Sequence, residues 1–156
     1  MLMTSDGISN NDWRAIKSIA ARIANATISN DGELVIKLRC ELLACITSLE
    51  VKYGQKASLL ATRADYVEDN QERISLLVKA YDIAQRHGDK LNMTLLCSSL
   101  ADLYIAEIGD RLEGRKWLSR LEAALDECWD SSEHRNLVNL RERLLQLENG
   151  DNKLKR

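Results

Sequence analysis

ASLLATRADY at residues 57–66 and LCSSLADLY at residues 96–104 are two versions of one pattern. In each stretch alanine and leucine recur at helical spacing, and a polar turn and a second amphipathic segment follow. The two copies lie about 40 residues apart, and a period of this length is typical of stacked helix pairs. The sequence therefore predicts a repeat architecture built from α-helical hairpins.

The composition of the whole chain also favours an all-α fold. Its 156 residues include no proline and only seven glycines, while hydrophobic residues make up 45% and charged residues 29%. Nothing in such a chain interrupts helices, and its Val and Thr residues are too scattered to build strands. We expect a flexible N-terminus over residues 1–10, one helical domain over residues 11–149 and a charged tail over residues 150–156. The expected helices span residues 11–27, 30–53, 56–67, 70–87, 90–108, 111–129 and 131–149.

Capping patterns at the helix starts support this division. In each of them an Asn or Asp precedes a Glu by three residues, so that the two side chains can bond to the free amides of the first turn. The first three patterns lie 39 and 41 residues apart, which matches the repeat. The pairs are Asn30 with Glu33, Asp69 with Glu72, Asp110 with Glu113 and Asp130 with Glu133.

The two helix pairs resemble tetratricopeptide-type repeats over residues 56–129. Leu100, Ala101 and Tyr104 match the large-small-aromatic signature of the family's first helix, and Gly114 falls where its second helix has a small residue. The period is nearer 40 residues than the family's 34, and the family's usual proline is absent. The resemblance implies a right-handed superhelix of antiparallel helix pairs, in which the first helix of each pair lines a concave groove.

The resemblance also implies which side chains face that groove. On each first helix they are Ser, Thr and Asp residues at helical spacing, so that each set forms one polar stripe. An ordinary solvated helix face is the alternative explanation for both stripes. Tyr66 is a further candidate, because tyrosine is common at binding hot spots. The implied groove residues are Ser58, Thr62, Asp65 and Asp69, followed by Thr94, Ser98 and Asp102.

The charge distribution favours a basic protein partner. The net charge is −2, which gives no general attraction to nucleic acid. Residues 41–110 carry seven basic and eleven acidic groups, a net charge of −4. An acidic surface attracts and orients a basic partner.

The chain is similar, more loosely, to the small all-helical immunity proteins that bacteria carry against their own secreted toxins. The similarity lies in its size, its cytoplasmic character, its acidic middle and the helix containing ATRADY at residues 61–66. It implies a non-catalytic inhibitor that covers the active site of a toxin, which is often a basic nuclease. A general adaptor that captures a peptide in the groove is the alternative within the same class.

An enzyme is the alternative of a different class. Asp65 with Glu68, and Glu107 with Asp110, could together hold magnesium, as two such pairs do in all-α nucleotide pyrophosphohydrolases. Asp110 already serves as a helix cap, and the Glu-x-x-Glu of that family is missing. We therefore expect no catalytic residues, no metal and no cofactor.

The remaining features indicate a cytoplasmic protein. No leader pattern is visible, and no stretch approaches the roughly 20 apolar residues of a membrane span. The cysteines lie among apolar neighbours and are expected to be small buried side chains in a reducing compartment. These cysteines are Cys40, Cys45, Cys97 and Cys128.

Overall fold

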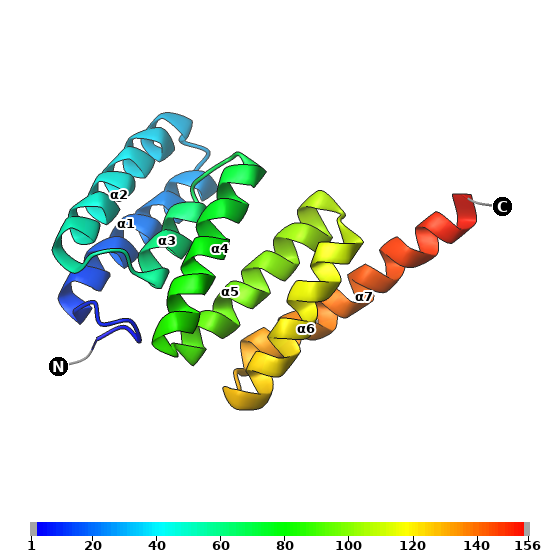
Figure 1. Cartoon of the computed structure of the whole chain (residues 1–156). Helices are drawn as coiled ribbons and strands as arrows, with labels where there is room; N and C mark the ends of the chain where they lie inside the picture. The colour runs from blue at the N-terminus through cyan, green and yellow to red at the C-terminus, as the bar shows by residue number, and fades with distance from the viewer. Residues whose placement is uncertain (1–2, 155–156) are drawn as a thin grey trace. The chain divides into compact units, whose positions relative to one another are not determined.

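A computed structural model describes residues 3–154 of the chain, with side chains as far as Gly150. Over that range the chain forms seven α-helices, one π-helical segment and no strand, so the all-α prediction is confirmed (Figure 1). Where the sequence predicted one domain, the chain divides within a helix into two compact units, one ending at Leu76 and the other beginning at Leu77. The helices are α1 (Asn10–Ile28), α2 (Gly32–Tyr53), α3 (Ala57–Ala64), α4 (Asn70–His87), α5 (Lys90–Asp102), η1 (Leu103–Ile108), α6 (Arg111–Glu127) and α7 (Ser131–Leu154).

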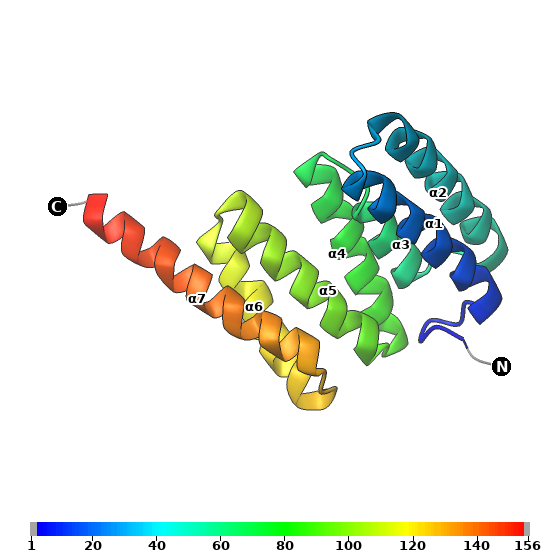
Figure 2. The ribbon, with the colours of Figure 1, turned by 180° about the vertical axis from the view of Figure 1, so that it is seen from behind.

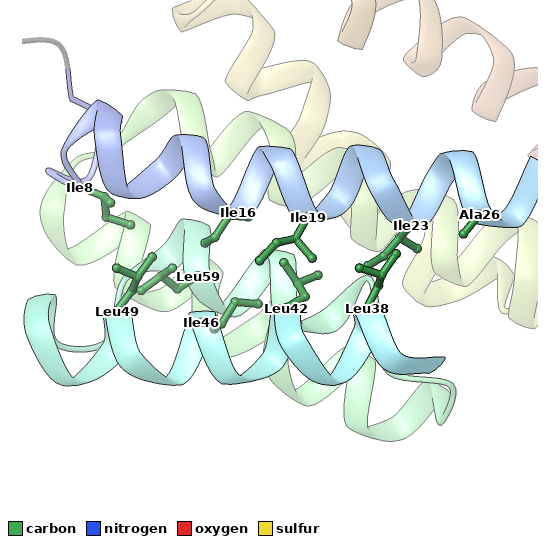
Figure 3. Packing of buried hydrophobic residues seen from close by; sticks show 10 residues of the cluster. All are labelled: Ile8, Ile16, Ile19, Ile23, Ala26, Leu38, Leu42, Ile46, Leu49 and Leu59. Atoms are coloured by element: carbon green, nitrogen blue, oxygen red, sulfur yellow. The ribbon is translucent and has the colours of Figure 1, made fainter. Parts of the chain in front are cut away.

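The first unit is built on the antiparallel pair α1 and α2 (Figures 1 and 2). Isoleucines at helical spacing on α1 point toward leucines at helical spacing on α2 (Figure 3). Burial of these apolar side chains is the main stabilising contribution to the pair. The cluster consists of Ile8, Ile16, Ile19, Ile23, Ala26, Leu38, Leu42, Ile46, Leu49 and Leu59.

The N-terminal segment is part of this unit from Met3 onward. The side chain of Ile8 is fully buried in the apolar cluster, and Ser9 caps α1 by accepting a hydrogen bond from the Asp12 amide. The prediction of a flexible segment over residues 1–10 therefore fails for its described part, because Ile8 anchors it. Residues 1 and 2 lie outside the described residues.

Three of the four predicted helix caps are confirmed. The side chains of Asp69, Asp110 and Asp130 each accept a hydrogen bond from the amide three residues later, at 2.8, 3.1 and 3.0 Å. The Asn30 prediction was wrong by one residue. Asp31 caps α2 instead, and Asn30 takes a left-handed conformation with φ of 55°, which asparagine tolerates better than most residues.

The second unit contains α5, α6 and α7. Both α5 and α7 lie antiparallel to α6, and α5 also contacts α7 (Figures 1 and 2). A Cβ atom at Gly114 of α6 would lie 2.5 Å from Cγ1 of Ile105, so a glycine is what allows this close approach of α6 to η1. The small residue implied at position 114 thus has a packing role.

The end of the chain differs from the prediction. The last helix was expected to stop at Asn149 and Gly150, but the backbone of α7 stays helical to Leu154. The side chains of residues 151–154, and all of residues 155–156, lie outside the described part of the chain.

Among the described residues, one helix is more apolar than the sequence analysis predicted. The helical stretch Lys90–Ile108, which consists of α5 followed by η1, is long and apolar enough to cross a membrane by length and composition alone. The prediction that no stretch has this character was therefore wrong. Half of its most apolar window is buried in the structure.

Candidate interaction surfaces

The polar stripe predicted on α3 does not face solvent as a whole. Ser58 is only 8% exposed, and its backbone amide donates to the Asp6 carboxylate. The half-buried hydroxyl of Thr62 donates to the Ser58 carbonyl oxygen at 2.8 Å. Ser58 therefore offers little exposed surface at the position predicted to face a groove. Asp65 and Asp69 remain exposed.

Tyr66 is half-buried and packs against the apolar cluster of the first unit. Burial raises the pKa of its phenol, and the negative charge of Asp65 adds to that effect. Part of the surface of the Tyr66 ring is therefore buried by contacts within the first unit. Only its remaining exposed part is open to a partner.

Exposed carboxylates gather where α3 passes into α4. We call Asp65, Glu68, Asp69 and Glu72 the acidic segment. Glu68 pairs with Arg39 at 3.2 Å, and both side chains are solvent-accessible. Desolvation by neighbouring groups raises the pKa of Asp65, and the positive charge of Arg73 opposes this shift.

The stripe predicted on α5 is mostly internal. Thr94 and Ser98, both predicted to face a groove, are only 1% and 4% exposed, and of the two only Ser98 lines a hollow. The Thr94 hydroxyl donates to the Lys90 carbonyl oxygen, and Ser98 Oγ accepts from Nδ2 of Asn136 at 2.7 Å. Small hydroxyl groups that bond within or between helices can be buried at little cost. Asp102 alone remains partly exposed.

Asp102 and Ser98 lie at a polar groove between α5 and α7. One hollow of about 440 Å³ extends from Leu95 of α5 to the first turns of α7, and a second of about 340 Å³ continues along α7 to Gln146. The two hollows share Asp102, Asn136 and Asn139. We call them together the α5–α7 groove. Its other lining residues are Ser99, Ser132, Glu133, Arg135, Leu140, Glu142 and Arg143.

The groove is lined by both hydrogen-bond donors and hydrogen-bond acceptors. The amides of Asn139 and Gln146 can donate and accept, Asp102 accepts, and Arg143 donates. The lining includes both carboxylates and guanidinium groups, so the groove is mixed in charge rather than uniformly acidic. Such a surface suits an extended polypeptide, whose backbone presents a donor and an acceptor at each residue.

An aromatic pair of exposed Trp129 and half-buried His134 lies beside one end of the groove. Trp129 is 66% exposed and its ring centroid lies 4.5 Å from that of His134. Ser132 and Glu133 of the groove lining lie between these two residues in the sequence.

Among residues 3–150, no three His, Cys, Asp or Glu side chains lie close enough to hold a metal ion together. Asp110, part of the enzyme alternative, accepts hydrogen bonds from the amides of Leu112 and Glu113. The cysteines are free; Cys97 is buried as expected, but Cys40 is exposed.

The sequence analysis did not identify the groove residues on α7, because the groove-facing positions were taken from the first helix of each pair. Asn136, Asn139 and Arg143 follow i, i+3, i+7, a spacing that marks one helix face and could have identified them. Comparisons of the chain with protein-family models, with curated proteins and with solved structures find no match.

Proposed function

We propose that the protein is a non-catalytic binding module that takes an extended segment of a partner protein into the α5–α7 groove. The observation that carries this proposal is the continuous polar lining shared by the two hollows. Side-chain amides that both donate and accept can pair with a peptide backbone in two directions at once. Helix stacks of this kind commonly serve as binding surfaces.

The test compares two lysine substitutions on the same helix. Asn139 lines both hollows, whereas Asn149 is exposed on α7 and lines neither. Wild-type protein and the Asn149→Lys variant should capture the same partner from the native cell. Asn139→Lys should weaken that binding at least about tenfold, measured by calorimetry with the purified partner. Equal affinity of the two variants would reject the groove as the binding surface.

The narrower function that we propose is inhibition of a basic toxin by an immunity-type mechanism. It is supported by the acidic segment, whose four carboxylates are all exposed, with Arg39 paired to only one of them. A negative patch accelerates association with a basic protein, and added salt screens this effect. In this proposal the protein acts in the cytoplasm, where the toxin would otherwise reach its target.

A charge reversal separates inhibitor from adaptor. Glu68→Lys changes the acidic segment, and Glu33→Lys makes the same change at an exposed position of α2. For a basic toxin, Glu68→Lys should lower the association rate several-fold at low salt, and the difference should shrink at high salt. A partner with an acidic or neutral surface, bound equally well by both variants, would leave the adaptor function and eliminate the inhibitor.

A further inference from the structure

The second unit carries a small apolar hollow apart from the α5–α7 groove. Its volume is about 140 Å³, and Tyr81, Met93 and Ala124 form its apolar lining. Its lining on α6 includes two small side chains, Ala123 and Ala124. We call it the α4–α6 notch.

Three charged side chains stand at the notch. Lys90 and Glu127 pair with each other at 3.0 Å, so their charges offset one another. Arg120 has no carboxylate partner among the described residues, and its guanidinium carbon lies 4.4 Å from the ring centroid of Trp117. One positive charge among the lining residues is thus left without a counter-charge.

The Arg120 side chain is exposed and contacts two aromatic rings. The Tyr81 and Trp117 rings meet edge to face, with centroids 5.2 Å apart and planes at 84°. The Arg120 guanidinium carbon lies 5.6 Å from the Tyr81 centroid as well. When an arginine stacks on an aromatic ring, its N–H groups point outward in the plane of the guanidinium and stay free to bond to an anion. Burial raises the pKa of Tyr81, so its hydroxyl stays neutral beside the arginine.

The size of the notch limits what it can hold. Sites for small molecules usually measure about 300–1,000 Å³, so a hollow of about 140 Å³ suits a single apolar side chain of a larger ligand. The carboxyl-terminal residue of a polypeptide presents a side chain and a carboxylate on the same Cα atom. Arginine binds a carboxylate with two parallel hydrogen bonds.

We propose that the α4–α6 notch binds the carboxyl terminus of a partner polypeptide, with the last apolar side chain in the hollow and the terminal carboxylate on Arg120. This inference rests on the proposed function, since it assumes a protein partner. It adds a second contact region to the groove and names the chemistry that the region recognises.

The test uses the full chain and the hexapeptide acetyl-Gly-Gly-Ser-Gly-Ser-Leu. The indole N–H signal of Trp117 in a ¹⁵N spectrum reports binding. The peptide with a free carboxylate should bind at least about tenfold more tightly than its carboxy-amidated form, because the amide loses the charged hydrogen bonds to Arg120. Equal affinities, or no shift with either peptide, would overturn the proposal. N-acetyl-leucine binding as tightly as the hexapeptide would overturn the assignment to a polypeptide.

Two variants test the charge and the hollow independently. Arg120→Gln should remove the preference for the free carboxylate, and Ala124→Leu should fill the notch and abolish binding of both peptides. Retained preference in Arg120→Gln would contradict the assigned role. The proposed function is tested separately by Asn139→Lys: if that variant loses the partner while the notch binds no peptide, only the present inference fails.

Discussion

The carboxylate of Asp6 accepts a hydrogen bond from the backbone amide of Ser58 at 2.9 Å, although 52 residues separate them in the sequence. The residue that precedes α3, Lys56, makes no side-chain cap. The N-terminal segment thus supplies the acceptor that the first turn of α3 lacks locally. The Thr4 hydroxyl donates to the other Asp6 oxygen at 2.7 Å and orients the carboxylate.

Asp6→Ala should therefore destabilise the protein by about 1 kcal/mol, as the loss of a helix cap does elsewhere. The midpoint and slope of urea unfolding measure this change. Asp126→Ala removes an exposed carboxylate of α6 and serves as the control, with an expected change below about 0.5 kcal/mol. Equal effects of the two substitutions would show that Asp6 does not act as a cap.

Asp12 predicts a pH dependence of stability. Hydrogen bonds from Lys52, Tyr53 and Ser9 lower the pKa of its carboxyl from 3.8 to about 2. A lowered pKa means that the ionised group stabilises the fold above about pH 4 and that this contribution is lost as the pH falls toward 2. Asp12→Asn should be less stable than wild type at neutral pH, and urea unfolding should show the gap closing between pH 4 and 2. A gap that stays constant over this range would contradict the assigned interactions.

Gly114 predicts a steric effect at the contact of α6 with η1. Alanine at this position would place Cβ 2.5 Å from Ile105, whose side chain is 3% exposed and has little room to move. Gly114→Ala should destabilise the protein by about 1–3 kcal/mol despite the better helix propensity of alanine. Gly150→Ala meets no atom within 4 Å and should be neutral or mildly stabilising. Thermal unfolding of the two variants measures this difference, and only Gly114→Ala should have a lower midpoint than wild type.

The cysteines predict a pattern of chemical reactivity. Burial raises the pKa of the Cys97 thiol to about 12, and the nearby positive charge of Arg120 only partly offsets it. The thiolate is the reactive form, so an alkylating reagent at pH 8 should modify exposed Cys40 quickly and Cys97 only after unfolding. Mass spectrometry of peptides from native and urea-treated protein gives the result. Rapid labelling of native Cys97 would show that its surroundings open readily.

Helices, caps and the small residue at position 114 could be predicted from the sequence because each depends on local chemistry. The capping roles of Asp69, Asp110 and Asp130 need only an acceptor followed by free amides, and Gly114 was marked by its place in the repeat. Ile8 was missed because a short segment before the first helix carries no periodicity. Its burial depends on the apolar cluster of α1 and α2, which is a tertiary feature.

The candidate site was less predictable for a physical reason. Thr94 and Ser98 are polar and share a helical face, which is also the pattern of an exposed stripe. A hydroxyl group can form its hydrogen bonds with a backbone carbonyl or a neighbouring side-chain amide, so its presence does not decide which side of a helix faces water. Only the packing of α5 against both α6 and α7 decides it.

The Trp129 ring, tilted by 39° against the ring of His134, gives the protein an intrinsic fluorescent probe. An indole with most of its surface in water changes its emission when another molecule displaces that water or moves the adjacent imidazole. If a peptide binds at the neighbouring end of the α5–α7 groove, the fluorescence of unlabelled protein should change, and this change should be absent from Trp129→Leu, in which Trp13 and Trp117 still emit.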